Sequence, residues 1–254
     1  MSIQRKIGIL PAIAAAAVFL LVSTAAGAQQ AAGSGTGQQA SPTTGGEITI
    51  EELFLKSVEF QILREKAFSD DFDIKMSALD DLEKKVADGS YKANDQQVEF
   101  VLEYLAMEGS GHTVREDGRL VNNFPDVRRR AANMLGRIGT DTARDALIRV
   151  LLIDDEPTVK AEAAYALGVM GKNPNNQVIQ ALAFTYNLED PSKPDNNFGY
   201  ALCLAVEKIA QSTPGGIKDP TAYQILVKIA GGNYLRTVKN KALQVLDELK
   251  TPPK

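Results

Sequence analysis

Two stretches of the chain decide the fold, namely Asp126–Gly139 (DVRRRAANMLGRIG) and Thr158–Gly171 (TVKAEAAYALGVMG). Each has a valine, Val127 or Val159, followed by apolar or small residues four, five, eight and eleven positions later. Residues three and four apart lie on the same face of an α-helix, so the spacing predicts a helix with one buried stripe. Both stretches end in glycine, the favoured residue where a helix terminates in a left-handed conformation.

The same template recurs elsewhere in the chain. Further copies start at Phe198 and Val238, and a degenerate copy starts at Ile74 but has Lys85 in the last slot. The last four copies start 32, 39 and 40 residues apart, which is the period of a two-helix repeat. A second helix is predicted in each unit, over residues 97–106, 141–152, 177–186 and 220–230. Because each unit must stack on its neighbours to bury its apolar face, the pattern predicts an all-α solenoid of about five helical pairs.

The two stretches around Val127 and Val159 resemble HEAT-like repeats, and more narrowly the short type first associated with phycobilisome lyases. The resemblance is strongest over residues 124–171, moderate over 197–250 and weak before Met107. It implies a right-handed α-solenoid, or HEAT-like superhelix, that serves as a protein-binding scaffold. It does not imply a lyase, because repeats of this type occur in many unrelated binding proteins.

The start of the chain predicts export. Residues 1–28 combine Arg5 and Lys6, an apolar run and the end Ala26-Gly27-Ala28, which are the parts of a cleavable signal peptide. Retention as a membrane anchor is the alternative, although Pro11 interrupts the run. Residues 29–47, rich in Gln, Ala, Gly, Ser and Thr, predict a flexible linker before a HEAT-like repeat domain over 48–254. We therefore expect a bacterial protein that is periplasmic or secreted, with no membrane span after signal cleavage.

Composition excludes several classes of site. The net charge is −4, so we expect no nucleic-acid partner, and one histidine and one cysteine exclude a disulfide framework or a cysteine-rich zinc site. Cys203 occupies a template slot and is expected to be a buried, inert thiol, whereas His112 lies in a polar loop. Asp70, Asp71 and Asp73 favour helix capping over a calcium loop. We predict that the protein is not an enzyme and has no catalytic, cofactor-binding or metal-ligating residue.

Basic residues directly after the template start, Arg128, Lys160 and Lys239, favour a structural role over binding of an acidic partner. We expect them to connect neighbouring repeats through an acid such as Asp126.

The candidate partner-binding residues lie on the second helices, which we expect to line the concave face. Aligning these helices gives one column of Phe100, Asp145, Gln180 and Gln224, and another of Tyr104, Arg149, Phe184 and Lys228. Aromatic and arginine side chains dominate interface energetics, so the columns predict a binding surface. The alternative is that Phe100 and Phe184 pack between helices.

Residues 108–124 are longer than a usual helix–helix connection and include Arg115 and Arg119. Such a loop is either a mobile insertion or a partner contact. The predicted function is a non-catalytic scaffold or adaptor of the bacterial cell envelope that binds an unidentified protein. A lyase-like enzyme or enzyme accessory, or a structural subunit of an envelope assembly, is the alternative.

Overall fold

The computed structural model describes residues 50–92 and 95–250. The predicted signal peptide and linker lie outside the described residues, so their boundaries stay predictions. Within the part that is described, no helix is both long and apolar enough to cross a membrane.

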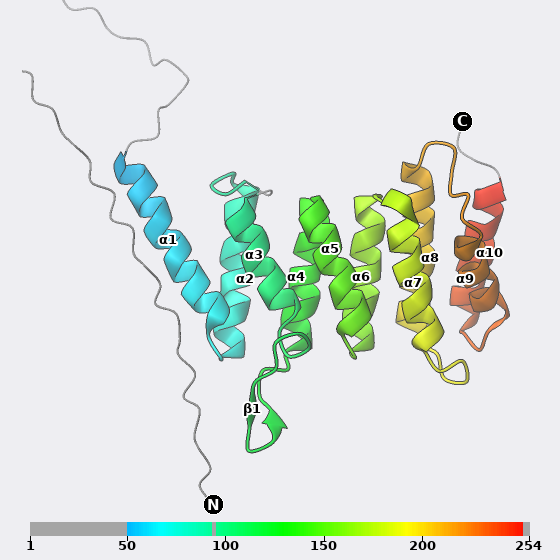
Figure 1. The fold of residues 1–254 in the computed structure, drawn as a ribbon, viewed down its shortest axis with the longest axis horizontal. Coiled ribbons are helices and arrows are strands. Elements are labelled where there is room, and N and C mark those ends of the chain that lie inside the picture. The colour runs from blue at the N-terminus through cyan, green and yellow to red at the C-terminus, as the bar shows by residue number, and fades with distance from the viewer. Residues whose placement is uncertain (1–49, 93–94, 251–254) are drawn as a thin grey trace, which may run out of the picture. The chain divides into compact units, whose positions relative to one another are not determined.

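Ten α-helices, one short 3-10 helix and one small β-hairpin make up the described part (Figure 1). Their bounds are α1 (Ile50–Phe68), α2 (Phe72–Ala87), α3 (Gln96–Ala106), β1 (Arg115–Glu116), β2 (Arg119–Leu120), α4 (Pro125–Ile138), α5 (Asp141–Ile153), α6 (Pro157–Met170), η1 (Pro174–Asn176), α7 (Gln177–Leu188), α8 (Asn196–Ser212), α9 (Pro220–Gly231) and α10 (Arg236–Lys250).

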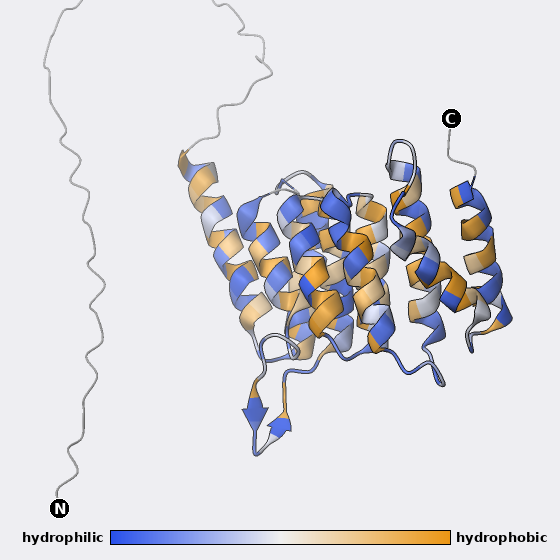
Figure 2. Ribbon diagram, turned by 45° about the vertical axis from the view of Figure 1, so that its right-hand side comes forward, coloured by the Kyte–Doolittle hydropathy of each residue, from blue (hydrophilic) through white to orange (hydrophobic). Residues whose placement is uncertain are grey.

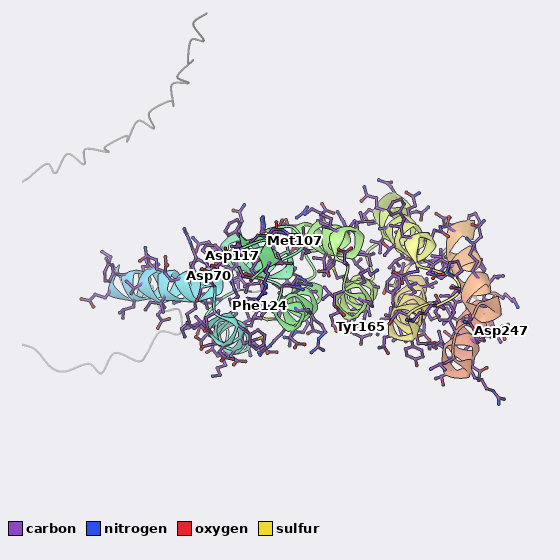
Figure 3. The ribbon with its side chains drawn as sticks, turned by 90° about the horizontal axis from the view of Figure 1, so that it is seen from below. Asp70, Met107, Asp117, Phe124, Tyr165 and Asp247 are labelled. Atoms are coloured by element: carbon purple, nitrogen blue, oxygen red, sulfur yellow. The ribbon has the colours of Figure 1, made fainter. Side chains whose placement is uncertain are left out.

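The helices stack in two layers (Figures 1 and 3). The first layer contains the template helices α2, α4, α6, α8 and α10, and the second contains α3, α5, α7 and α9, while α1 packs on α2 and α3 at one end. This arrangement confirms the predicted all-α solenoid. The second helices fall within two residues of the predicted ranges, and each copy of the template lies inside a first helix.

Local sequence explains where the helices begin and end. The side chain of Asp71 accepts hydrogen bonds from the backbone N–H groups of Asp73 and Ile74, which satisfies two donors at the start of α2. The capping role predicted for this aspartate is thereby confirmed. Gly139 and Gly171 end α4 and α6 at φ 69° and 64°, the left-handed conformation that the terminal glycines predicted.

The template residues form the core. In α8, all five template positions are fully buried, including Phe198 and Cys203. The outer copies are less completely buried, and two of their positions are exposed, Ile74 by 43% and Leu243 by 52%. In α2 the neighbouring Lys75 is buried instead, and in α10 the Leu243 slot faces the side on which, among the described residues, no further helix packs.

The first helices α4, α6 and α8 approach one another closely. A Cβ built on Gly136 of α4 would lie 2.7 Å from Ala166 Cβ of α6, and one on Gly168 would lie 2.6 Å from Ala205 Cα of α8. Such close backbone approach requires glycine and alanine at the contact. The second-layer helices contact one another less extensively. That the second helices line the concave face stays a prediction.

Candidate functional site

The predicted binding columns lie on the exposed side of the second layer. Phe100 is 58% exposed and Phe184 is 57% exposed, so these rings do not pack between helices as the alternative interpretation required. Tyr104 is half-buried, and the remaining members are exposed, namely Asp145, Arg149, Gln180, Gln224 and Lys228. The structure therefore leaves both columns accessible, and their role in binding stays a prediction.

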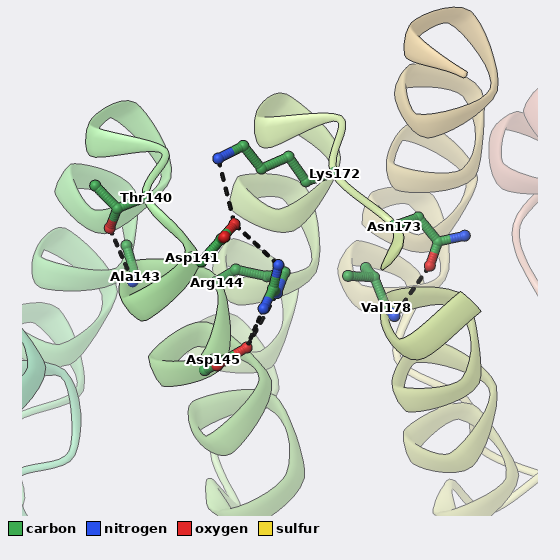
Figure 4. A network of polar contacts seen from close by, with 8 residues as sticks. All are labelled: Thr140, Asp141, Ala143, Arg144, Asp145, Lys172, Asn173 and Val178. Carbon is green, nitrogen blue, oxygen red and sulfur yellow. Dashed lines mark hydrogen bonds and ion pairs between the residues drawn. The ribbon is translucent and has the colours of Figure 1, made fainter. Parts of the chain in front are cut away.

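The charged members of the columns already have partners within the protein. Arg149 of α5 forms an ion pair with Glu103 of α3, and Lys228 of α9 donates a 2.9 Å hydrogen bond to Asn187 of α7. Asp145 accepts 2.8 Å and 3.0 Å hydrogen bonds from Arg144, as the polar network in Figure 4 shows. Arg149 and Lys228 thus bridge neighbouring second helices, so reversing their charge would disturb the helix packing as well as any interface.

Four aromatic side chains gather where α1, α3 and the following loop meet. Tyr104 lies at the centre, with its ring 4.4 Å from the ring of Phe68 and 5.5 Å from that of His112, measured between centroids. Phe68 also meets Phe100 edge-to-face at 6.4 Å. We call these four residues the aromatic cluster. It unites two predicted binding residues, Phe100 and Tyr104, with two that the sequence analysis did not select for binding.

A buried ion pair lies beneath the aromatic cluster. Lys75 Nζ is 2.7 Å from Glu108 Oε1, both side chains are at most 2% exposed, and the ammonium lies 5.6 Å from the centre of the Tyr104 ring. Lys75 Nζ also donates a 3.0 Å hydrogen bond to the carbonyl of Ala67 at the end of α1. Burial raises the pKa of Glu108, and its bond to Lys75 only partly offsets that rise. The pair ties α1, α2 and the end of α3 together and supports the cluster from below.

The loop after α3 forms a β-hairpin that projects from the stack (Figure 1). Asp117 and Gly118 turn the chain with φ values of 47° and 80°. At the base, the side chain of Asn122 accepts a 2.8 Å hydrogen bond from Val114 N and donates a 2.6 Å one to the carbonyl of His112. The hairpin was not predicted, although an Asp-Gly pair is a known hairpin signal. Arg115 and Arg119 lie exposed on the two strands.

Arg128 and Lys160, two of the three basic residues predicted to connect repeats, form a ladder with a different set of acids from the one predicted, whereas no ion pair of Lys239 is found in residues 50–92 and 95–250. Arg128 Nε is 2.6 Å from Asp154 Oδ2, with both side chains buried, and Lys160 Nζ is 2.5 Å from Glu189 Oε1. Lys75 and Glu108 repeat the pattern one unit earlier. Each pair links a first helix to the end of the second helix in the same unit, whereas Asp126 bonds to exposed Arg129. The predicted partner was wrong because sequence spacing does not show which helix ends meet.

Cys203 is fully buried, and burial raises the pKa of its thiol to about 12. A thiol with that pKa is protonated at neutral pH and is a poor nucleophile or metal ligand, as the sequence predicted. Residues 50–92 and 95–250 bring together no group of three or more His, Cys, Asp or Glu side chains that could hold a metal ion.

A pocket of 430 Å³ lies between the loop after α7 and the end of α9. Tyr186, Tyr234, Pro191 and Pro194 form its apolar walls, and Lys228 reaches it from the second predicted column. Of these residues only Lys228 was selected from the sequence, because the pocket forms from two loops that are far apart in the chain.

Comparisons with known proteins agree with this architecture. A family model described as HEAT repeats matches residues 119–193, which run from the hairpin through α4, α5 and α6 into the loop after α7. The protein is a HEAT-like repeat protein. A search of curated proteins found no match. Among solved structures, this HEAT-like repeat protein is similar to the complex of CpcE and CpcF of phycocyanin lyase from Nostoc sp. PCC7120, with 17% identity and a TM-score of 0.41. That match covers 84% of this chain and 82% of the other chain.

The solved structure also corrects one prediction. The protein was expected not to be an enzyme, and the similar structure is a lyase complex, so that expectation was wrong. The lyase activity and the two-subunit assembly are properties of the Nostoc complex. At 17% identity the match assigns no reaction and no catalytic residue to this HEAT-like repeat protein.

Proposed function

We propose that this HEAT-like repeat protein is exported to the bacterial cell envelope and binds a protein partner there. The main contact is the aromatic cluster together with the adjoining hairpin. Export rests on the signal-like residues 1–28, and binding rests on the exposed aromatic side chains at the α3 end of the second layer.

The aromatic cluster supports this proposal because it is both exposed and held in place. Phe100 exposes more than half of its surface, while Phe68 and Tyr104 behind it pack against the core. Arg64 lies 5.5 Å from the centre of the Phe68 ring, which adds a basic edge to the patch. Preformed aromatic and arginine contacts lose little conformational entropy on binding and contribute most of the energy in typical interfaces.

The hairpin extends the same surface. His112 belongs to the aromatic cluster and also pairs with Glu108 at the hairpin base, so the two features are physically joined. Arg115 and Arg119 present basic groups on the strands beyond it. The matching partner is a protein segment with an apolar side chain for Phe100 and an acidic side chain for the hairpin arginines.

The test is a crosslinked pull-down from intact cells with wild-type protein, Phe100→Ser, and the double variant Arg115→Glu with Arg119→Glu. Both variants are expected to lose the principal partner and to keep the helical circular dichroism and unfolding midpoint, because the three side chains are exposed. Phe184→Ser is the matched control, since Phe184 is equally exposed on the same layer. Loss of the partner only in Phe184→Ser would place the site on α7 instead. Retention in all variants would contradict the proposal.

A further inference from the structure

The first helix, α1, is apolar on two sides. One side carries Leu63 and Ala67, which are buried against the rest of the stack. The other side carries a stripe of large apolar residues that nothing covers among the described residues, with exposed fractions of 67% for Phe54, 60% for Leu55 and 54% for Ile62. In Figure 2, hydrophobic and hydrophilic positions alternate along the ribbon of α1. A helix at the end of a solenoid normally has a polar outer side.

The other end of the stack has a smaller exposed apolar feature. Leu243 of α10 occupies the template slot that holds Ala132, Ala164 and Cys203 in the inner copies. Those three residues are fully buried. Ala132 and Ala164 lie one helical turn before Gly136 and Gly168, which contact the next first helix, so the slot faces the next unit. Leu243 is 52% exposed, so α10 presents a stacking surface without a following unit in the described part of the chain.

The two end surfaces carry opposite charge. By helical spacing, Glu51 and Glu65 lie beside the Phe54–Ile62 stripe on α1, and both are exposed. Arg236 and Lys239 lie beside Leu243 on α10. On the same helix Lys250 forms an ion pair with Asp247, so these two charges offset each other. Figure 3 places Asp247 at this far end of the stack. The apolar stripe of α1 is therefore bordered by acidic side chains, while the exposed Lys56 and Arg64 lie on other sides of that helix. The apolar surface of α10 is bordered mainly by basic side chains.

We propose that copies of this protein associate head to tail, with α10 of one copy packed against the outer side of α1 of the next. The second copy supplies the neighbour that each end lacks, so the two-layer stack continues across the interface. Charge complementarity selects this pairing over α1 against α1, which would bring acidic borders together. A heterologous contact of this kind forms open chains or closed rings, not closed two-fold dimers. The inference concerns the ends of the stack and stands apart from the proposed binding surface.

The test is sedimentation equilibrium of the mature protein over a range of concentrations. The average mass of the wild-type protein is expected to rise with protein concentration. It should rise less at high salt, because salt screens the attraction between the charged residues beside the two apolar surfaces. A head variant, Leu55→Glu with Ile62→Glu, and a tail variant, Leu243→Glu, are each expected to remain monomeric. Phe184→Glu is the control, since it changes an equally exposed apolar residue away from both ends and should associate like wild type.

Mixing the two blocked variants separates the head-to-tail arrangement from others. The head variant retains a working tail and the tail variant a working head, so an equimolar mixture is expected to form a 1:1 dimer and nothing larger. A wild-type protein that stays monomeric would overturn the proposal. So would a tail variant that still associates, because this indicates α1 pairing with α1. Circular dichroism checks that each variant is folded. If a glutamate variant unfolds, Leu55→Ser replaces the head variant and Leu243→Ser replaces the tail variant.

Discussion

The internal units and the two ends of the stack use similar apolar helices with different results. Leu167, in the template of α6, is fully buried between neighbouring units, while Leu243, in the corresponding helix α10, is half exposed. A second contrast lies within one internal unit, where Asp154 is buried with Arg128 and Asp126 lies at the surface. A template therefore predicts which side of a helix is apolar, but burial depends on whether a neighbour is present to cover it.

The largest expected loss of stability comes from breaking the buried ion pair between Asp154 and Arg128. Asp154→Ala should lower the free energy of unfolding by about 3–5 kcal/mol, because it leaves the Arg128 guanidinium buried without its counter-charge. The surface counterpart Asp126→Ala should change it by less than about 1 kcal/mol. Urea denaturation of both variants measures the difference. Equal effects would mean that the ladder contributes no more than an ordinary surface pair.

Leucine truncation sharpens the same contrast in the apolar core. Leu167→Ala should destabilise the fold by about 2–5 kcal/mol, since it opens a cavity between packed helices. Leu243→Ala, in a monomeric sample, should cost less than about 1 kcal/mol because half of the side chain is already in water. The measurement is chemical denaturation at low protein concentration. A large loss for Leu243→Ala would show that the α10 end is covered in solution.

Adding a methyl group at the close contact between α4 and α6 should lower stability by a smaller amount. Gly136→Ala should destabilise the protein by about 1–3 kcal/mol, because the new methyl group would lie 2.7 Å from Ala166 Cβ. Gly231→Ala is the control, since nothing lies within 4 Å of a Cβ there, and it should be neutral or slightly stabilising. Thermal unfolding compares the two. A neutral Gly136→Ala would contradict the close packing of α4 on α6.

The smallest effect concerns a polar contact between units. Glu162 is half-buried and accepts a 2.7 Å hydrogen bond from Asn133 of the preceding first helix. Glu162→Ala should therefore lower stability by about 0.5–1.5 kcal/mol. Asn133→Ala should match it, and the double variant should lose no more than either single variant. Additive losses would show that the two side chains act independently.

Much of the binding surface could be predicted residue by residue, but its assembly could not. Helical alignment selected Phe100 and Tyr104 because each occupies a column to which the other second helices also contribute a residue. Phe68 and His112 were not selected for binding, since they come from α1 and from a loop and meet Tyr104 only in three dimensions. The hairpin had one readable signal, Asp117-Gly118, flanked by strands too short to show an alternating pattern.

The sequence by itself determined the helical repeat, the period of the units and the buried stripe of α4, α6 and α8, because these depend on residues three and four apart within one helix. Only the tertiary structure decided where first helices approach most closely, since that depends on Gly136 and Gly168 meeting alanines of other helices. It also decided that Arg128 pairs with Asp154 and not with Asp126. Contacts between helices depend on how whole units stack, and local spacing carries no record of that geometry.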